Sequence, residues 1–160
     1  MRSMVSRLGP LNLLLVFLAA QSCQAQTVPR DELQRRIAFA DGQFASSSTR
    51  GSQTDRGKVY IAFGPPDRID NHDGTENPNH LREFVGYPWQ EWTYRAIPGI
   101  ATDVRMLFVD TTYSRAYRMC PPTASGDSRK DSQATRRYAL IQKWIKQALA
   151  SANRPQKNAP

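Results

Sequence analysis

The chain has 160 residues and carries 22 Lys or Arg against 14 Asp or Glu, which gives a net charge of +8. This length suits one domain with tails rather than two domains. Neither the two histidines nor the two cysteines have the spacing of a zinc site, and no Gly-x-Ser-x-Gly sequence is present. Zinc-binding modules and serine hydrolases of that type are therefore disfavoured.

Residues 1–22 are predicted to form a secretory signal peptide. Arg2 and Arg7 precede an apolar core from Leu11 to Ala20, and small and polar residues follow. The core is about ten residues long, which is too short for a stable membrane-spanning helix. The mature protein is therefore expected to be exported, to the periplasm, the outer membrane or the medium.

Two positions for signal cleavage are open. Cleavage before Cys23 leaves a cysteine at the new N-terminus, as in bacterial lipoproteins, where that thiol carries the lipid. Cleavage after Ala25 releases an unmodified protein. A lipid at Cys23 would anchor the protein to a membrane. The second cysteine, Cys120, is interpreted as a small, partly buried residue at a strand end.

The mature chain is predicted to begin with a helix. Pro29 lies near its start, Asp31 and Glu32 lie in its first turn, and Ser46–Ser48 end it. Its apolar positions are Leu33, Ile37, Phe39, Ala40 and Phe44.

A second, short helix is favoured from Thr54 to Gly64. Thr54 suits the N-cap position and Asp55 suits the positive end of the helix dipole. Gly64, followed by Pro65 and Pro66, is typical of a helix end. The run 58–63 is also rich in branched and aromatic residues, so a strand is the competing interpretation.

The segment 67–80 is polar and turn-rich, and it gathers both histidines with several carboxylates. The candidate residues for a metal site or for acid–base catalysis are Asp67, Asp70, His72 and Asp73, because carboxylates beside a histidine can hold a cation or activate water. Their spacing matches neither an EF-hand loop nor a helical His-Glu-x-x-His site. An acidic, solvated loop without chemistry is the simpler interpretation.

Three antiparallel strands are predicted next, over 89–95, 104–109 and 113–119, because side chains alternate there between two faces. The short connections 97–103 and 110–112 suit hairpins, so the strands form a meander. Trp92 and Tyr94 are interpreted as core and sheet-face aromatics. The arginines of these strands, Arg95 among them, are interpreted as solvated charges.

Residues 120–133 are predicted to be a linker, 134–152 a basic amphipathic helix, and 153–160 a disordered tail. In the simpler interpretation the helix packs its apolar stripe on the domain and keeps its charges in water. In the alternative it binds a membrane surface, with Trp144 beside Lys143 and Lys146 at the interface. Nucleic acid is not an expected partner for an exported protein.

Four motifs within residues 31–119 resemble those of the GWxTD domain, a family of secreted bacterial proteins with no established activity. They are Thr54-Asp55-Arg56-Gly57, Gly64-Pro65-Pro66-Asp67, Trp92-x-Tyr94-Arg95 and Ile97-Pro98-Gly99-Ile100. The name motif of the family has a Trp where this chain has Ser52. A His near the position of His72 also recurs in the family pattern.

Together these patterns predict an α+β fold with two N-terminal helices, a three-stranded antiparallel meander and a C-terminal amphipathic helix. This order is similar to that of the small lipoproteins of the outer-membrane barrel-assembly machinery, which are non-catalytic scaffolds. We therefore expect an exported, non-catalytic interaction module with an unidentified protein partner in the cell envelope and no cofactor. The alternative is an enzyme that uses the loop from Asp67 to Asp73, with a metal or by acid–base chemistry.

Overall fold

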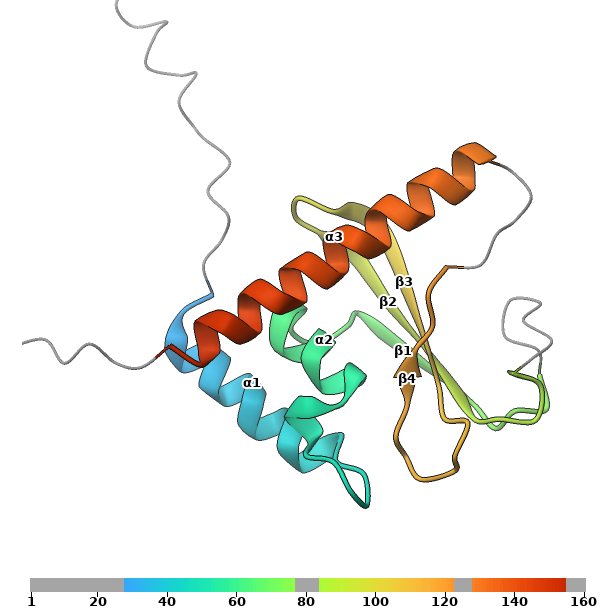
Figure 1. Cartoon of the computed structure of the whole chain (residues 1–160), viewed down its shortest axis with the longest axis horizontal. Coiled ribbons are helices and arrows are strands. Elements are labelled where there is room, and N and C mark those ends of the chain that lie inside the picture. Colours follow the sequence, from blue (N-terminus) through green and yellow to red (C-terminus); the bar gives the residue numbers. More distant parts are fainter. Residues whose placement is uncertain (1–27, 77–83, 123–127, 155–160) are drawn as a thin grey trace, which may run out of the picture.

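The computed structural model describes residues 28–76, 84–122 and 128–154 (Figure 1). Its elements in chain order are α1 (Arg30–Gln43), the 3-10 turn η2 (Gly51–Gln53), α2 (Asp55–Phe63), β1 (Arg68–His72), β2 (Trp89–Ile97), β3 (Ala101–Val109), β4 (Arg118–Met119) and α3 (Ser128–Ala152). This architecture confirms the predicted α+β class, with four strands instead of three. The predicted signal peptide 1–22 and Cys23 lie outside the described residues.

The four strands form one antiparallel sheet in the order β1-β2-β3-β4. The prediction of a polar loop over 67–80 is wrong for its first half, because Arg68–His72 pair with Thr93–Trp89 of β2. Strand propensity depends strongly on context. The backbone partners that β2 supplies outweigh the polar composition of β1.

The third predicted strand, 113–119, is wrong for most of its length, because only Arg118 and Met119 pair with β3. Asp110 provides the physical reason. Its carboxylate accepts hydrogen bonds from the backbone N–H groups of Thr112, Ser114 and Arg115 at 3.2, 3.3 and 2.7 Å. These bonds wind the chain into a turn, in which Tyr113 and Arg115 have φ of 53° and 65°. Such left-handed residues interrupt a strand.

The hydrophobic core lies between one face of the sheet and the helices. Trp92 and Phe108 are fully buried on that face, with their ring centroids 4.9 Å apart. Leu33 of α1, Ile61 of α2 and Ile141 of α3 belong to the same core. In Figure 1, α1 and α2 lie beside one another and α3 runs across the sheet. Trp92 is therefore a core residue, as the sequence predicts.

α3 begins at Ser128, earlier than the predicted residue 134, so the predicted linker 120–133 is too long. The first turns of α3 are polar, and the periodicity of apolar residues cannot detect such turns. Asp131 lies in the first turn, where the helix dipole favours a negative charge. Of the tail predicted to be disordered, residues 155–160 lie outside the described part of the chain.

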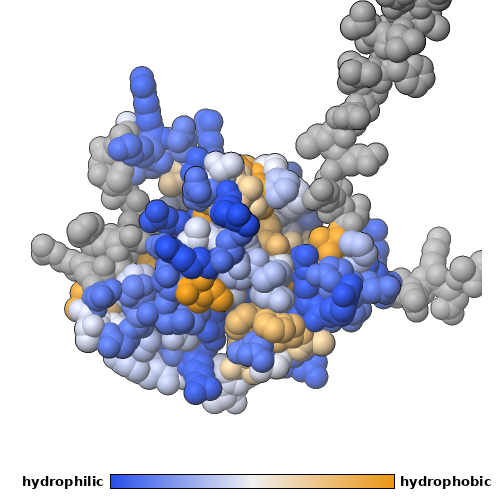
Figure 2. Space-filling model, turned by 180° about the vertical axis from the view of Figure 1, so that it is seen from behind, coloured by the Kyte–Doolittle hydropathy of each residue, from blue (hydrophilic) through white to orange (hydrophobic). Residues whose placement is uncertain are grey.

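The face of the molecule seen in Figure 2 is mostly hydrophilic. Figure 2 shows only small, separate hydrophobic areas on the back of the molecule. The large apolar side chains that are exposed among the described residues are Phe39, Ile69, Val85, Tyr113 and Leu140. Single exposed apolar residues of this kind are normal on soluble domains.

Candidate functional site

The motif Thr54–Gly57 forms the start of α2. The hydroxyl oxygen of Thr54 accepts a hydrogen bond from the Gly57 N–H at 3.1 Å, and its O–H donates to the Gly51 carbonyl at 2.7 Å. This confirms the predicted N-cap, a contact that typically stabilises a helix by about 1 kcal/mol. Asp55 binds a residue that is distant in the sequence, because its Oδ2 accepts a hydrogen bond from the backbone N–H of Met119 at 3.0 Å. The motif therefore ties α2 to β4.

Two glycines let three backbone segments pack directly against one another. A Cβ at Gly57 would lie 1.8 Å from the Gly51 carbonyl oxygen, and a Cβ at Gly51 would lie 1.8 Å from the Ala40 carbonyl oxygen. A larger residue at either position would force these segments apart. Gly57 is therefore required by the packing of α1, η2 and α2.

Ser52 joins η2 to α1. Its backbone N–H donates to Asp41 Oδ1 at 2.8 Å. Hydrogen bonding from Ser52 holds the pKa of Asp41 below its usual range. Ser52 is only partly buried, so a polar side chain at this position does not lose its contact with water.

Arg56 is a buried charge, with 6% of its surface exposed. Its guanidinium carbon lies 4.1 Å from the centroid of the Tyr117 ring and 5.3 Å from that of Phe44. It donates to Gln90 Oε1 at 3.2 Å and to the Arg115 carbonyl at 3.0 Å. Burial lowers the pKa of Arg56, and the nearby Tyr117 and Asp110 oppose that shift. The side chain joins α2, β2 and the turn before β4.

Gly64 ends α2, as predicted, with φ of 80° and ψ of −165°. Residues other than glycine rarely adopt this conformation. The Gly64 carbonyl accepts the Tyr94 O–H at 3.1 Å, and Arg36 of α1 donates to the Ile61 carbonyl at 3.2 Å. Burial raises the pKa of Tyr94 far above its usual range. This corner of the fold is therefore held by two side-chain bonds to the end of α2.

Pro65 and Pro66 lead the chain from α2 to β1, where Asp67 binds the neighbouring strand. The Asp67 carboxylate accepts the Arg95 side chain at 2.6 Å and the Arg95 backbone N–H at 2.8 Å. These bonds, the backbone one first, lower the pKa of Asp67. The Arg95 side chain is 85% exposed, so solvent weakens the ion pair. Asp67 thus helps to set the alignment of β1 on β2.

The other predicted loop residues each bind a separate partner. The His72 ring stacks on Trp89 at 3.6 Å between centroids, and its Nδ1 lies 2.7 Å from Glu76 Oε2. Asp73 accepts the N–H and the hydroxyl of Thr75 at 2.9 and 2.7 Å. Asp70 pairs with Arg68 at 2.9 Å.

The structure does not join these loop residues into one site. Within residues 28–76, 84–122 and 128–154, no three His, Cys, Asp or Glu side chains are placed to hold a metal ion together. The second histidine of this segment, His80, lies outside the described residues. The contact between His72 and Glu76 is the arrangement here that most resembles acid–base machinery.

α3 has a buried face and a basic outer face. Ile141, Ile145 and Ala152 are buried, whereas Arg136, Lys143 and Lys146 are exposed. Asp131 is the only acidic residue in the sequence of α3. None of the ion pairs formed between described residues includes Arg136, Lys143 or Lys146. We call these three residues the outer basic row.

Trp144 does not belong to the outer basic row. A Cβ at Gly99, in the turn between β2 and β3, would lie only 3.3 Å from the Trp144 ring. Trp144 therefore packs against this turn and is partly buried, which differs from the interfacial position considered from the sequence. The exposed apolar side chain beside the row is Leu140.

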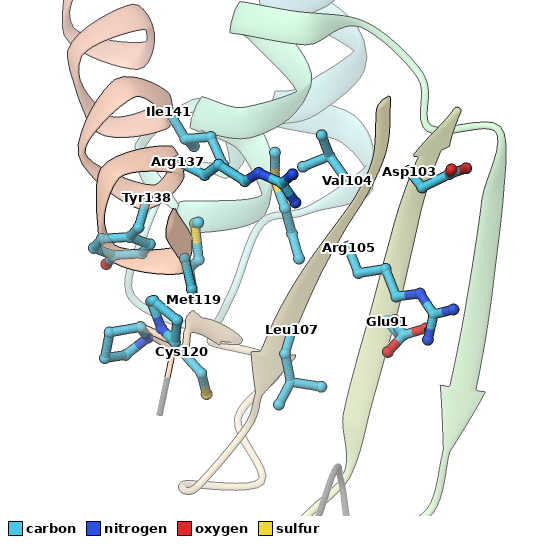
Figure 3. Close-up of a pocket in the computed structure, with 14 residues that line it drawn as sticks. Glu91, Asp103, Val104, Arg105, Leu107, Met119, Cys120, Arg137, Tyr138 and Ile141 are labelled. Atoms are coloured by element: carbon cyan, nitrogen blue, oxygen red, sulfur yellow. The ribbon is translucent and has the colours of Figure 1, made fainter. Parts of the chain in front are cut away.

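A groove of about 330 Å³ lies between β3 and the first half of α3 (Figure 3). Arg105 and Leu107 of β3 form one wall, and Arg137, Tyr138 and Ile141 of α3 form the other. The segment from Met119 to Pro122 closes one end. In Figure 3 the Arg137 side chain reaches from α3 toward β3.

Three residues that the structure places in key contacts were not predicted from the sequence. Arg36 binds the end of α2, Asp110 winds the turn before β4, and Arg137 lines the groove. For Asp110, the following Thr-Tyr-Ser run was a usable turn signal, because an Asp often accepts backbone N–H bonds a few residues later. The contact of Arg36 with α2 and the place of Arg137 in the groove have no local signal, because α2 and β3 are distant from these residues in the sequence.

No helix among the described residues is long and apolar enough to cross a membrane. The resemblance to the GWxTD domain stays a prediction, carried by motif residues whose contacts hold the fold together. No protein-family model matches the chain, and no curated protein or solved structure matches it either.

Proposed function

We propose that this protein is an exported, non-catalytic interaction module of the cell envelope, and that it binds an anionic membrane surface through the outer face of α3. The observation that carries the proposal is the outer basic row, Arg136, Lys143 and Lys146, exposed on a helix whose single acid is Asp131. The motif residues are consistent with a non-catalytic role, because their contacts are those of packing, capping and strand alignment.

The size of the expected effect follows from the geometry of a helix. Residues 136 and 146 are ten residues apart, so the row extends over about 15 Å at 1.5 Å per residue. Each Lys or Arg near an anionic lipid surface contributes about 1 kcal/mol. Three such residues contribute about 3 kcal/mol, which corresponds to a factor on the order of one hundred in membrane affinity.

Vesicle co-sedimentation tests this proposal. The protein should bind vesicles rich in phosphatidylglycerol and should not bind phosphatidylcholine vesicles, and binding should weaken as salt screens the charges. The variant R136E/K143E/K146E should lose binding. The control variant R35E/R50E/R118E changes the net charge equally at exposed positions outside α3. Equal loss in both variants would mean that net charge, and not this face, drives binding.

A second candidate function is acid–base or metal-assisted catalysis at the loop from Asp67 to Asp73. The specific observation in its favour is the contact of 2.7 Å between His72 Nδ1 and Glu76 Oε2, because a carboxylate can orient a histidine as a base. Titration calorimetry with zinc, calcium and manganese tests the metal version. Heat that disappears in H72A would support it, and no heat with any of the three ions would remove it.

A further inference from the structure

Among the described residues, the outer edge of β3 has a strand partner at only one end. Phe108 and Val109 pair with β4. Nearer the start of β3, the only backbone hydrogen bond to this edge between described residues runs from the Cys120 N–H to the Leu107 carbonyl at 2.8 Å. Pro121 and Pro122 follow. Because proline has no backbone N–H, this segment cannot continue the ladder along β3.

The open edge presents backbone groups to the groove. In an antiparallel strand, successive residues direct their N–H and C=O groups toward opposite neighbours. The Leu107 carbonyl points to the β4 side, so the N–H and C=O of Arg105, two residues away, point to the same side. An unpaired edge of this kind is a template for another strand. α3 stands beside this edge as the second wall of the groove.

The groove offers apolar and positively charged side chains around this edge. Met119, Tyr138 and Ile141 supply the apolar surface. Arg137 supplies the charge, and it belongs to none of the ion pairs formed between described residues. Of the acids in the lining, Glu91 lies 3.8 Å from Arg105. Figure 3 shows the other, Asp103, on the side of β3 away from Arg137.

We propose that this groove binds an extended, acidic peptide segment of another protein as an added strand beside β3. The peptide backbone bonds to the outward N–H and C=O of Arg105, beyond the point where Cys120 bonds to Leu107. One of its apolar side chains packs on Met119 and Tyr138, and one of its acidic side chains pairs with Arg137. The positive charge of α3, with Asp131 as its single acid, favours a negative partner. The inference rests on the proposed interaction role but uses residues other than the outer basic row.

Three synthetic heptapeptides test the proposal in solution. All have Val at the odd positions, and the even positions are Glu, Ser or Lys. The Glu peptide should bind at least about tenfold more tightly than the Ser peptide, because a hydrogen bond to a charged partner typically contributes 1.5–3 kcal/mol. The Lys peptide should not bind. R137A should lose the preference for Glu, and the matched control R136A, one residue away on the outer face, should keep it.

Hydrogen exchange of backbone amides locates the peptide. The Glu peptide should protect the amide of Arg105. Binding without that protection, equal binding by R137A and R136A, or no binding of any peptide would overturn the proposal. Protection already present in the free protein would also overturn the proposal, because a segment of this chain would then fill the groove. If that protection rises with protein concentration, a second copy of the chain fills it instead.

The two proposals can fail separately. R137A should still bind anionic vesicles nearly as well as wild type, and R136E/K143E/K146E should still bind the Glu peptide at the groove. Loss of peptide binding with vesicle binding retained would remove only the groove proposal. The thermal stability of R137A serves as the folding control, because Arg137 is an exposed residue of α3.

Discussion

Replacing Gly57 with Ala should destabilise the protein, although the same change normally stabilises a helix. Gly57 lies within α2, where Ala is favoured over Gly by about 1 kcal/mol. A Cβ at this position, however, would lie 1.8 Å from the Gly51 carbonyl oxygen. The atom it meets is backbone, so no side chain can rotate away, and η2 must shift relative to α2.

The magnitude follows from these two opposing effects. Overpacking in a well-packed interior typically costs 1–3 kcal/mol, and a backbone clash belongs at the upper end. After subtraction of the gain in helix propensity, G57A should lose about 2 kcal/mol. For a domain of this size, that loss lowers Tm by about 6–10 °C.

Gly42 provides a matched control within α1. It is exposed, and a Cβ there would meet nothing within 4 Å. G42A should therefore raise stability by about 0.5–1 kcal/mol. Thermal and urea unfolding of wild type, G42A and G57A measure both changes. A G57A protein as stable as G42A would refute the direct packing of α2 on η2.

Three further predictions concern other contacts, and a fourth concerns the N-terminus. G64A should lose about 1–3 kcal/mol in urea unfolding, because alanine is strained at φ of 80° and its Cβ would lie 3.1 Å from the Arg36 guanidinium; an unchanged midpoint would contradict this account of the turn. R56K should lose about 2 kcal/mol, because lysine cannot reproduce the planar stacking on Tyr117 together with both hydrogen bonds; wild-type stability of R56K would show that only the charge is needed. Burial alone would raise the pKa of Asp110, but hydrogen bonds from Arg115 and Thr112 outweigh it and hold the pKa below the ordinary value of 3.8. A depressed carboxyl pKa stabilises the fold above the unfolded-state pKa and ceases to do so as pH falls through the folded-state pKa. D110N should thus be less stable than wild type at pH 7, and the difference in the free energy of unfolding should shrink below about pH 4. A difference that does not vary with pH would mean that the shape of the Asp110 side chain, and not its charge, stabilises the turn. Finally, intact mass of the protein from a membrane fraction should show a chain that starts at Cys23 with an added diacylglycerol, and an unmodified chain in the soluble fraction would exclude the lipid anchor.

Local signals were sufficient for much of the helical part of the fold. Thr54 caps α2 and Gly64 ends it, and both residues act on backbone groups within a few positions of themselves. The core role of Trp92 follows from alternation along β2, because every second residue of a strand shares a face. These features depend on short stretches of sequence, so they can be read directly from it.

The features that sequence analysis missed depend on distant partners or on competing local bonds. β1 is polar, and it forms a strand because β2 pairs with it across a separation of about twenty residues. The segment 113–119 alternates like a strand, but bonds to the Asp110 carboxylate turn it instead. The groove combines β3, β4 and α3, which become neighbours only after the sheet and the helix have packed.

The two ends of the described domain lie together. Arg30 Nη2, at the start of α1, donates to the Arg154 carbonyl, just beyond α3, at 3.0 Å, and Figure 1 shows both ends on one side of the molecule. If Cys23 carries a lipid, six residues lie between it and Arg30, and an extended chain over these seven steps reaches about 25 Å. α3 would then meet the bilayer at an effective concentration on the order of millimolar. A lipid at Cys23 would therefore strengthen membrane binding by the outer basic row, whereas a released protein would depend on the affinity of the row alone.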